Sequence, residues 1–423
     1  MDNFIGWLTL YLIFTFILYR IKDSAILNFL LAAFILRASF IILDEYFIDL
    51  PGGALDAKGF LVNAAKYSNT YGLSILLDMF QDTNSLFISR VISVFYSLTY
   101  ENEMMAKGIG LGLGTASVYY VYYICLLIWD RTAAIKAAWI MALHPSMVLY
   151  SVLVLKEVYV TFTLLVTLLP IIFLIKNLAI KEKLKIKKNN FFYKNFIYIV
   201  LITIGFFFLK NIHGAMFLGA VSFLFFMLYY FLKNELHNLK KGKIKIKVLI
   251  ILSIIFSLFL LWFYDILKIP YVPGSKRIMN LNDILLRRFN IGSISAINGD
   301  FGSNYPNWTI PNKDTDFIAY VTKIFARIIY FLYSPFPWDL KRYYHLIGFA
   351  DSALMFYITI CAWNNRTLIW EDPVTRLLLL LLLTYVLIYG LGTNNFGTAI
   401  RHKTKFMFIL ICLAAPKLLK FKH

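Results

Sequence analysis

Charged residues are scarce in this chain. Only 15% of its 423 residues are Asp, Glu, Lys or Arg, whereas 60% are hydrophobic and 18% aromatic. Soluble domains are about 45–50% apolar and about 25% charged, so the composition excludes an ordinary soluble protein. Acidic residues are the rarer kind, 23 against 42 basic ones, which gives a formal net charge of +19. The lysines gather in short loops between apolar segments, a pattern typical of membrane proteins, and we expect no nucleic-acid partner.

Cysteine is rare as well. Cys125, Cys361 and Cys412 all lie within apolar stretches and lack the spacing of a metal site. We interpret them as packing residues. No internal repeat is visible. The first apolar stretch, Asn3–Tyr19, has no basic residue before it and no small-residue cleavage site after it, so we expect a retained helix instead of a removed signal peptide.

Long apolar runs, by contrast, recur along the whole chain. A helix needs about 20 mostly apolar residues to cross a bilayer core. The runs predict an all-α polytopic membrane protein with about eleven transmembrane helices, plus interfacial helices in two long extracytoplasmic loops. The predicted spans are 3–19, 25–43, 108–129, 133–151, 153–175, 195–212, 215–233, 248–264, 345–363, 374–391 and 406–420.

The basic residues fall mostly on one side of this threading. The loops after every odd-numbered helix, together with the C-terminal tail, carry most of the +19 charge. Because lysine-rich loops stay in the cytoplasm, we expect the N-terminus outside and the C-terminus inside. The predicted segments are two N-terminal helices (1–43), a first external loop (44–107), six helices (108–264), a second external loop (265–344) and three helices (345–423).

The segment 317–334 is the weak point of this threading. It is long enough to span, but Lys323 and Arg327 stand four residues apart and therefore share one helical face. We interpret it as an amphipathic helix in the membrane interface that Pro335 and Pro337 terminate. If it spanned, every later loop would change sides.

The first external loop holds the best candidate for a catalytic carboxylate. Asp56 follows the turn Pro51-Gly52-Gly53 and precedes a stretch of helical periodicity, so it sits at or near a helix start. A carboxylate at the membrane surface can act as a general base toward a hydroxyl. It can also orient an acceptor through a divalent metal, or serve only as a helix cap. The sequence leaves these alternatives open.

Further candidates lie near other predicted outer helix ends. Ionisable groups close to the membrane core usually face a cavity or a partner. Lys156 and Glu157 are such groups, at the start of the predicted span 153–175. A local ion pair at the helix end would also explain them. Basic residues of the second and third external loops could bind a phosphate or pyrophosphate. Lipid headgroups or nearby acids could equally neutralise them. These basic candidates are Arg287, Arg288, Arg401, His402 and Lys403.

Four segments together resemble the polytopic membrane glycosyltransferases of the GT-C class, which include protein mannosyltransferase-like and aminoarabinose-transferase-like enzymes. The segments are LDAKGFLVNAAKY, AAWIMALHPSMVLYSVLVLKEVYVTF, SPFPWDL and FGTAIRHKTKFMFILICLAA. The resemblance implies that Asp56 is the catalytic base and Glu157 a second acidic site residue. It also implies that Arg401 and His402 contact the phosphate of a polyprenyl-linked donor. The chain departs from the class in an extra early helix and in lacking the large soluble C-terminal domain of some members.

These expectations define a function for a bacterial cytoplasmic (inner) membrane protein. It would transfer a sugar, with presumed inversion, from a polyprenyl-phosphate- or pyrophosphate-linked donor to a glycan or lipid acceptor on the outer face. O-antigen and capsule polymerases are similar in size and external loops and are the close alternative. A lipid-linked glycan flippase or transporter is the second. The sequence assigns no cofactor, and a divalent metal that would orient the acceptor stays an open alternative.

Overall fold

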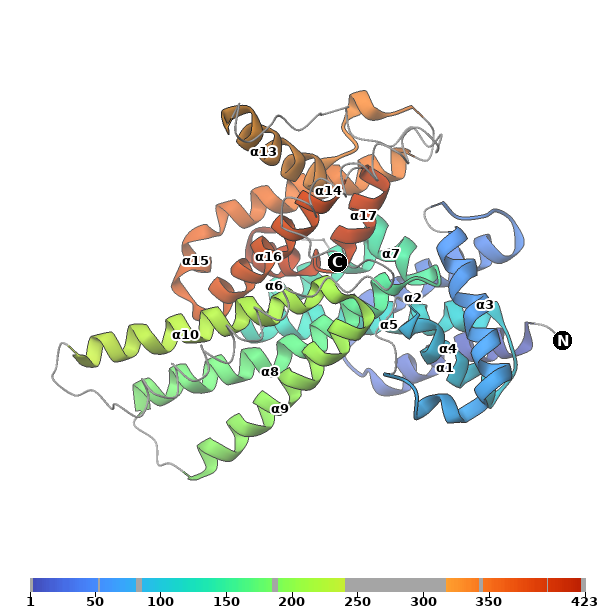
Figure 1. Cartoon of the computed structure of the whole chain (residues 1–423), viewed down its shortest axis with the longest axis horizontal. Helices are drawn as coiled ribbons and strands as arrows, with labels where there is room; N and C mark the ends of the chain where they lie inside the picture. Colours follow the sequence, from blue (N-terminus) through green and yellow to red (C-terminus); the bar gives the residue numbers. More distant parts are fainter. Residues whose placement is uncertain are drawn as a thin grey trace, which may run out of the picture.

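The computed structural model describes residues 3–51, 54–80, 86–184, 189–239, 317–341, 345–393 and 395–419. Within these ranges the chain forms α-helices and short 3-10 helices, and no strand (Figure 1). The predicted all-α fold class is therefore confirmed for this part of the chain.

The helices are numbered as in Figure 1. The N-terminal part contains α1 (Phe4–Arg20), α2 (Ser24–Tyr46), α3 (Ala54–Tyr71), η1 (Gly72–Leu76), α4 (Phe87–Leu98) and α5 (Glu103–Ile128). The middle contains α6 (Arg131–Leu143), α7 (Pro145–Val152), α8 (Lys156–Leu184), α9 (Asn189–Ile212), η2 (Gly214–Phe217) and α10 (Leu218–Leu239). The C-terminal part contains α13 (Phe317–Tyr333), η3 (Pro337–Asp339), α14 (His345–Asn364), α15 (Arg366–Glu371), α16 (Pro373–Gly392), α17 (Phe396–Thr404), α18 (Phe408–Ala414) and η4 (Ala415–Lys417).

Six of the described helices are long and apolar enough to cross a membrane. They are α2, α5, α14, α16 and the segments Lys156–Leu178 of α8 and Asn195–Ile212 of α9. The pair α6 and α7 would make a seventh span. The predicted spans 3–19, 215–233 and 406–420 appear as shorter apolar helices, and 248–264 lies outside the described residues. The larger count of about eleven stays a prediction.

The predicted span 133–151 is not one continuous helix. It consists of α6 and α7, which meet at an angle of 56°. Pro145 is the first residue of α7, and His144 before it has extended backbone angles. A proline disfavours the helical region for the preceding residue, so the break follows directly from the sequence His144-Pro145.

Close packing between α5 and α7 depends on glycine. A Cβ atom added to Gly110 would meet the carbonyl oxygen of Ser151 at 2.6 Å, and one added to Gly114 would meet the Ser151 Cβ at the same distance. Small residues allow such close approach of membrane helices. This contact fixes α7 against the core of the bundle.

Ion pairs join loops that the charge pattern places on a common side. Arg131 lies in the loop between the third and fourth predicted spans and donates at 2.7 Å to Asp23, in the loop between the first and second. At the other ends of the second and third predicted spans, the buried ammonium of Lys107 contacts three carboxylates. They are Asp44 at 2.7 Å, Glu45 at 2.9 Å and Glu103 at 3.0 Å. The segment predicted as the first external loop is thereby tied to α5, and within it α3 packs against α4.

The amphipathic helix α13 ends at Tyr333, just before Ser334 and Pro335, as predicted. It packs along α16, with Phe331 fully buried. Its Arg327 is also buried, and Nη2 donates to the carbonyl oxygen of Thr393 at 3.3 Å. One face of α13 is thus covered by protein, and its position relative to a membrane stays a prediction.

Candidate functional site

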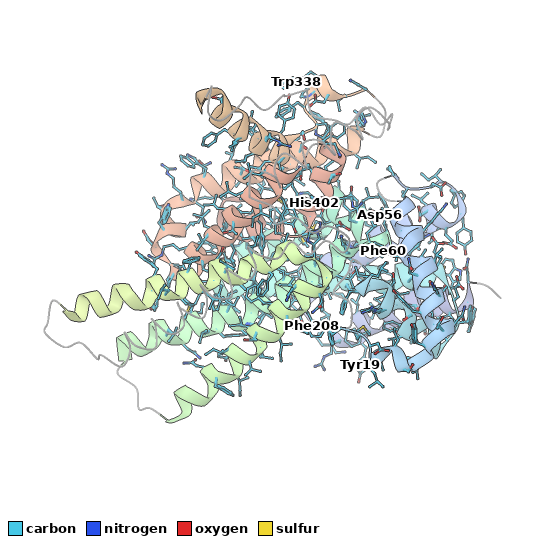
Figure 2. All side chains as sticks on the ribbon, viewed as in Figure 1. Tyr19, Asp56, Phe60, Phe208, Trp338 and His402 are labelled. Carbon is cyan, nitrogen blue, oxygen red and sulfur yellow. The ribbon has the colours of Figure 1, made fainter. Side chains whose placement is uncertain are left out.

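Three segments far apart in the sequence meet at one cluster of charges. The guanidinium of Arg401 donates from Nη1 to Oδ2 of Asp56 at 2.7 Å and from Nε to Oε1 of Glu157 at 3.3 Å. Figure 2 shows Asp56 at the edge of the N-terminal helices, facing the C-terminal part that carries His402. The structure therefore brings together three residues that the sequence analysis singled out separately.

Helix ends explain why these charges sit where they do. Asp56 lies in the first turn of α3 and Glu157 in the first turn of α8, whereas Arg401 lies in the last turn of α17. Helix N-termini favour negative groups and C-termini favour positive ones. The start of α17 is fixed by Asn395, whose side chain accepts from the Thr398 backbone N–H at 2.7 Å. Each charge is thus placed by the end of its own helix.

Glu157 is the centre of the cluster. The residue is fully buried, and its Oε1 faces both Arg401 Nε and, at 3.4 Å, the ammonium Nζ of Lys405. Its Oε2 has no hydrogen-bond partner among the described residues. One carboxylate therefore neutralises two cations in the interior, whereas Asp56 is largely exposed, at 58% of its side chain.

Lys405 extends the cluster toward His402. Its fully buried ammonium lies 2.7 Å from Nδ1 of His402 and 5.3 Å from the centre of the Tyr389 ring. The Tyr389 ring lies 4.8 Å from the His402 ring, and its hydroxyl is 3.1 Å from Nδ1 of His213. Two histidines and a tyrosine therefore border the cations on this side.

Lys156, the remaining predicted residue of this region, begins α8 and is partly buried. It is near enough to Glu157, Arg401 and Asp56 for their charges to interact. With Lys156 and Lys405 included, three cations face two carboxylates in the described part of the chain. Asp56 and Glu157 pair with Arg401, in line with the alternative that nearby acids neutralise the basic residues. The three cations nevertheless outnumber the two acids.

Lys403 lies elsewhere. Residues two apart on a helix point to nearly opposite sides, and Lys403 is buried away from Arg401. Its Nζ donates to the Leu332 carbonyl oxygen at 2.9 Å and lies 3.6 Å from Oδ2 of Asp351. The structure thus separates Lys403 from the cluster of Asp56, Glu157 and Arg401.

A second buried polar cluster surrounds Asp351. Its Oδ1 contacts Nδ1 of His144 at 3.1 Å and accepts from the Ser146 backbone N–H at 3.2 Å. These contacts link α14 to the break between α6 and α7. With the Lys403 pair they also fix α17, so this cluster positions the helix that carries Arg401.

The environment shifts the pKa values of the cations on α17 in different directions. Burial opposes the charge of Arg401, but Glu157 and Asp56 outweigh it and raise the pKa of Arg401. Burial lowers the pKa of Lys405 from 10.5 to about 7, with Glu157 opposing the shift. Burial and the charge of Lys405 lower the pKa of His402 well below its usual value. His402 is therefore a neutral imidazole near pH 7.

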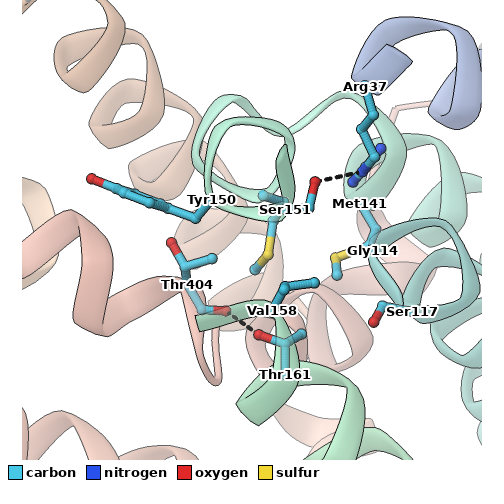
Figure 3. Close-up of a pocket in the computed structure, with 10 residues that line it drawn as sticks. Arg37, Gly114, Ser117, Met141, Tyr150, Ser151, Val158, Thr161 and Thr404 are labelled. Carbon is cyan, nitrogen blue, oxygen red and sulfur yellow. Dashed lines mark hydrogen bonds between the residues drawn. The ribbon is translucent and has the colours of Figure 1, made fainter. Parts of the chain in front are cut away.

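A small cavity lies beside the cluster, bordered by Val158 and Thr161 of α8 (Figure 3). Arg37 of α2 reaches it. This guanidinium is fully buried and donates to Ser151 Oγ at 2.9 Å and to two backbone carbonyls, whereas its Nη2 has no partner in the described part of the chain. Arg37, which lies within a predicted membrane-spanning helix, is thus hydrogen-bonded without a carboxylate among the described residues.

Two of the predicted basic residues, Arg287 and Arg288, lie outside the described residues. Conversely, Lys405, His213 and Asp351 are not among the site residues predicted from the sequence. The motif RHKTK contains Lys405 one helical turn after Arg401, and this spacing was the available signal. Nothing in the sequence indicated that His213 and Asp351 approach α17.

The described residues hold no group of three or more His, Cys, Asp or Glu side chains arranged for a metal ion. At the cluster, Arg401 joins the two carboxylates, Asp56 and Glu157. Comparison with known proteins finds no match: no family model fits the sequence, and no curated protein or solved structure is significantly similar. The function is therefore inferred from the residues themselves.

Proposed function

We propose that this protein is an integral membrane glycosyltransferase. It transfers a sugar from a polyprenyl-phosphate- or pyrophosphate-linked donor to an acceptor hydroxyl at the extracytoplasmic face of a bacterial inner membrane. The observation that carries the proposal is the bridge from Arg401 to both Asp56 and Glu157, at 2.7 and 3.3 Å. Together with the neighbouring Lys156 and Lys405, it supplies an exposed carboxylate and an excess of cations beside apolar helices, which is what an anionic lipid-linked donor requires.

The proposed reaction is a displacement at the sugar carbon that carries the phosphate. Asp56 removes the proton of the acceptor hydroxyl, the acceptor oxygen forms the new bond to that carbon, and the bond to the phosphate oxygen breaks. The phosphate leaves as an anion. Arg401, His402 and Lys156 then stabilise its charge, since cations placed in advance in a site of low dielectric act most strongly where charge develops. Attack opposite the leaving group inverts the sugar carbon.

The ion pair between Asp56 and Arg401 sets the order of steps in the proposed reaction: the donor binds before Asp56 acts as a base. While Asp56 is paired with Arg401, its Oδ2 accepts a hydrogen bond from the guanidinium and is not available to an acceptor hydroxyl. A donor phosphate that binds Arg401 replaces Asp56 there, because arginine pairs readily with phosphate oxygens. Glu157 holds Arg401 through Nε during the exchange. Asp56 is thus released only when the donor is bound, which limits wasteful transfer to water.

A deletion strain tests the proposal. We expect its surface polysaccharide to lose the product and its membranes to accumulate a polyprenyl-linked sugar or oligosaccharide, both restored by the wild-type gene. Unchanged polysaccharide and lipid-linked pools would overturn it. Single repeat units still attached to their carrier, without long chains, would identify the reaction as repeat-unit polymerisation, the close alternative.

Transport of a lipid-linked glycan is a second candidate function. Broken helices and buried charges are features of transporters. Here α6 and α7 meet at 56°, and Arg37 is buried between helices. Turnover of a lipid-linked sugar by the purified protein in detergent, where no compartments exist, would exclude pure transport. Absence of turnover, with vesicle-dependent movement of the glycolipid, would favour it.

A further inference from the structure

In the contact between Lys405 and His402, the donor and the acceptor can be assigned. The two nitrogen atoms, Lys405 Nζ and His402 Nδ1, are 2.7 Å apart, a full hydrogen bond. A lysine ammonium has three donors and no acceptor. Nδ1 of His402 must therefore be the acceptor when Lys405 is charged. In a neutral imidazole, the single ring proton then lies on Nε2.

Lys405 is itself held in place from two other sides. Its Nζ lies 3.4 Å from Oε1 of Glu157 and faces the Tyr389 ring at 5.3 Å. Within the described part of the chain no hydrogen-bond partner is found for His402 Nε2, although the imidazole as a whole is packed against Tyr389. The Nε2–H is thus a donor that a ligand could use.

We infer that Lys405 is a positioning residue: by donating to Nδ1 of His402 it fixes the tautomer of that imidazole, so that His402 presents a neutral Nε2–H donor beside Arg401. The inference deepens the proposed function, since the leaving phosphate of the donor would accept this hydrogen bond. Glu157 joins the two parts of the site, because the same carboxylate oxygen holds Arg401 and Lys405.

The arrangement depends on pH. Burial lowers the pKa of Lys405 to about 7. Above that pH the neutral amine can accept as well as donate, and the tautomer of His402 is no longer fixed. The charged and titratable groups that face this pair are Lys156 and Glu157 from α8, Arg401 from α17, His213 from the turn after α9 and Tyr389 from α16.

Nitrogen-15 NMR of the histidine rings tests the inference without any activity assay. The full chain is labelled at its six histidines and reconstituted in nanodiscs, and the His402 signals are assigned as those lost in His402→Asn. At pH 6 we expect a neutral ring with the proton on Nε2 and none on Nδ1. A proton on Nδ1 at this pH would overturn the inference.

Two substitutions separate the charge of Lys405 from its bulk. Lys405→Met should raise the midpoint at which His402 takes up its second proton by about one pH unit or more, because a like charge is removed from its side. Lys405→Arg, which keeps a donor, should leave the midpoint low. Equal midpoints in wild type and Lys405→Met would refute the inference.

The wild-type protein supplies an independent measurement if Lys405→Met does not fold. Its Nδ1 signal should change as the pH rises through about 7, where Lys405 loses its proton; a signal constant from pH 6 to pH 9 would contradict the inference. A fixed tautomer in a protein that transfers no sugar would overturn the proposed function alone. Transfer without a fixed tautomer would overturn only the role of Lys405.

Discussion

Glu157→Gln is the substitution for which the structure makes the sharpest prediction. The wild-type carboxylate is fully buried and its Oε1 neutralises both Arg401 at 3.3 Å and Lys405 at 3.4 Å. Glutamine has nearly the same shape but no charge, so the buried Lys405 would lose its carboxylate partner in the described part of the chain, and Arg401 would keep only Asp56. Breaking a buried ion pair in this way costs about 3–5 kcal/mol of unfolding free energy. Because two cations share Glu157, we expect a loss toward the upper end.

Glu103→Gln is the matched control. Glu103 also pairs with a buried lysine, Lys107 at 3.0 Å, but its own side chain is 49% exposed. Lys107 keeps Asp44 and Glu45 as partners when Glu103 is neutralised. Because Glu103 is half exposed and Lys107 keeps two other carboxylates, we expect a loss close to the value of a surface ion pair, about 0–1 kcal/mol. The two substitutions remove the same charge and differ mainly in burial.

Thermal unfolding in detergent with a thiol-reactive dye measures both variants. Cys125, Cys361 and Cys412 are free and buried, so the dye reacts only as the fold opens. Glu157→Gln should unfold at a clearly lower temperature than wild type and Glu103→Gln. The double variant Glu157→Gln with Lys405→Met should recover part of the loss, since one uncompensated cation is gone. Equal unfolding temperatures for wild type and Glu157→Gln would refute the central role of this carboxylate.

Three further predictions concern the same site. Arg401→Lys should lower sugar transfer at least tenfold in the purified protein, because one ammonium cannot reproduce the guanidinium bridge to Asp56 and Glu157; wild-type rates would contradict this. His402→Ala should lower the turnover number about 100-fold if its Nε2–H stabilises the leaving phosphate, and an effect on donor KM alone would contradict that role. Lys405 is protonated in the unfolded chain up to about pH 10.5 but in the folded chain only up to about pH 7. Because the unfolded chain binds more protons between these values, the free energy of unfolding should rise from pH 7 toward pH 10. The rise should be smaller in Lys405→Met.

The sequence predicted the fold class and the helix positions well, because apolar runs and helix caps are local signals. Asp23, Asn102 and Asp130 accept backbone N–H bonds at the starts of α2, α5 and α6, close to the expected helix starts. The break at His144-Pro145 was also a local signal, but apolar periodicity on both sides concealed it. The number of spans depends on segments that the structure leaves undescribed or shows as short helices.

The site could be predicted only in part. Asp56 stood out as a carboxylate at a helix start in the first predicted external loop, and Glu157 and Arg401 as charges near predicted membrane helix ends. In the structure Arg401 pairs with both acids. Lys403 was selected by the same reasoning, yet helical geometry directs it to Asp351. Lys405 belongs to the same basic run as Arg401, but its contacts, like those of His213, depend on which helices pack together. That information is in the tertiary contacts, not in local spacing.

Turnover by the purified protein tests the central claim most directly. The substrate is the lipid extract of the deletion strain, and the measurement is release of polyprenyl phosphate or pyrophosphate together with transfer of the sugar. We predict turnover by wild type and by Asp49→Asn, a control at an exposed carboxylate of the same loop. Asp56→Asn, which removes the proposed base and its ion pair with Arg401, should have none. Wild-type turnover by Asp56→Asn, or none by the wild-type protein, would contradict the account.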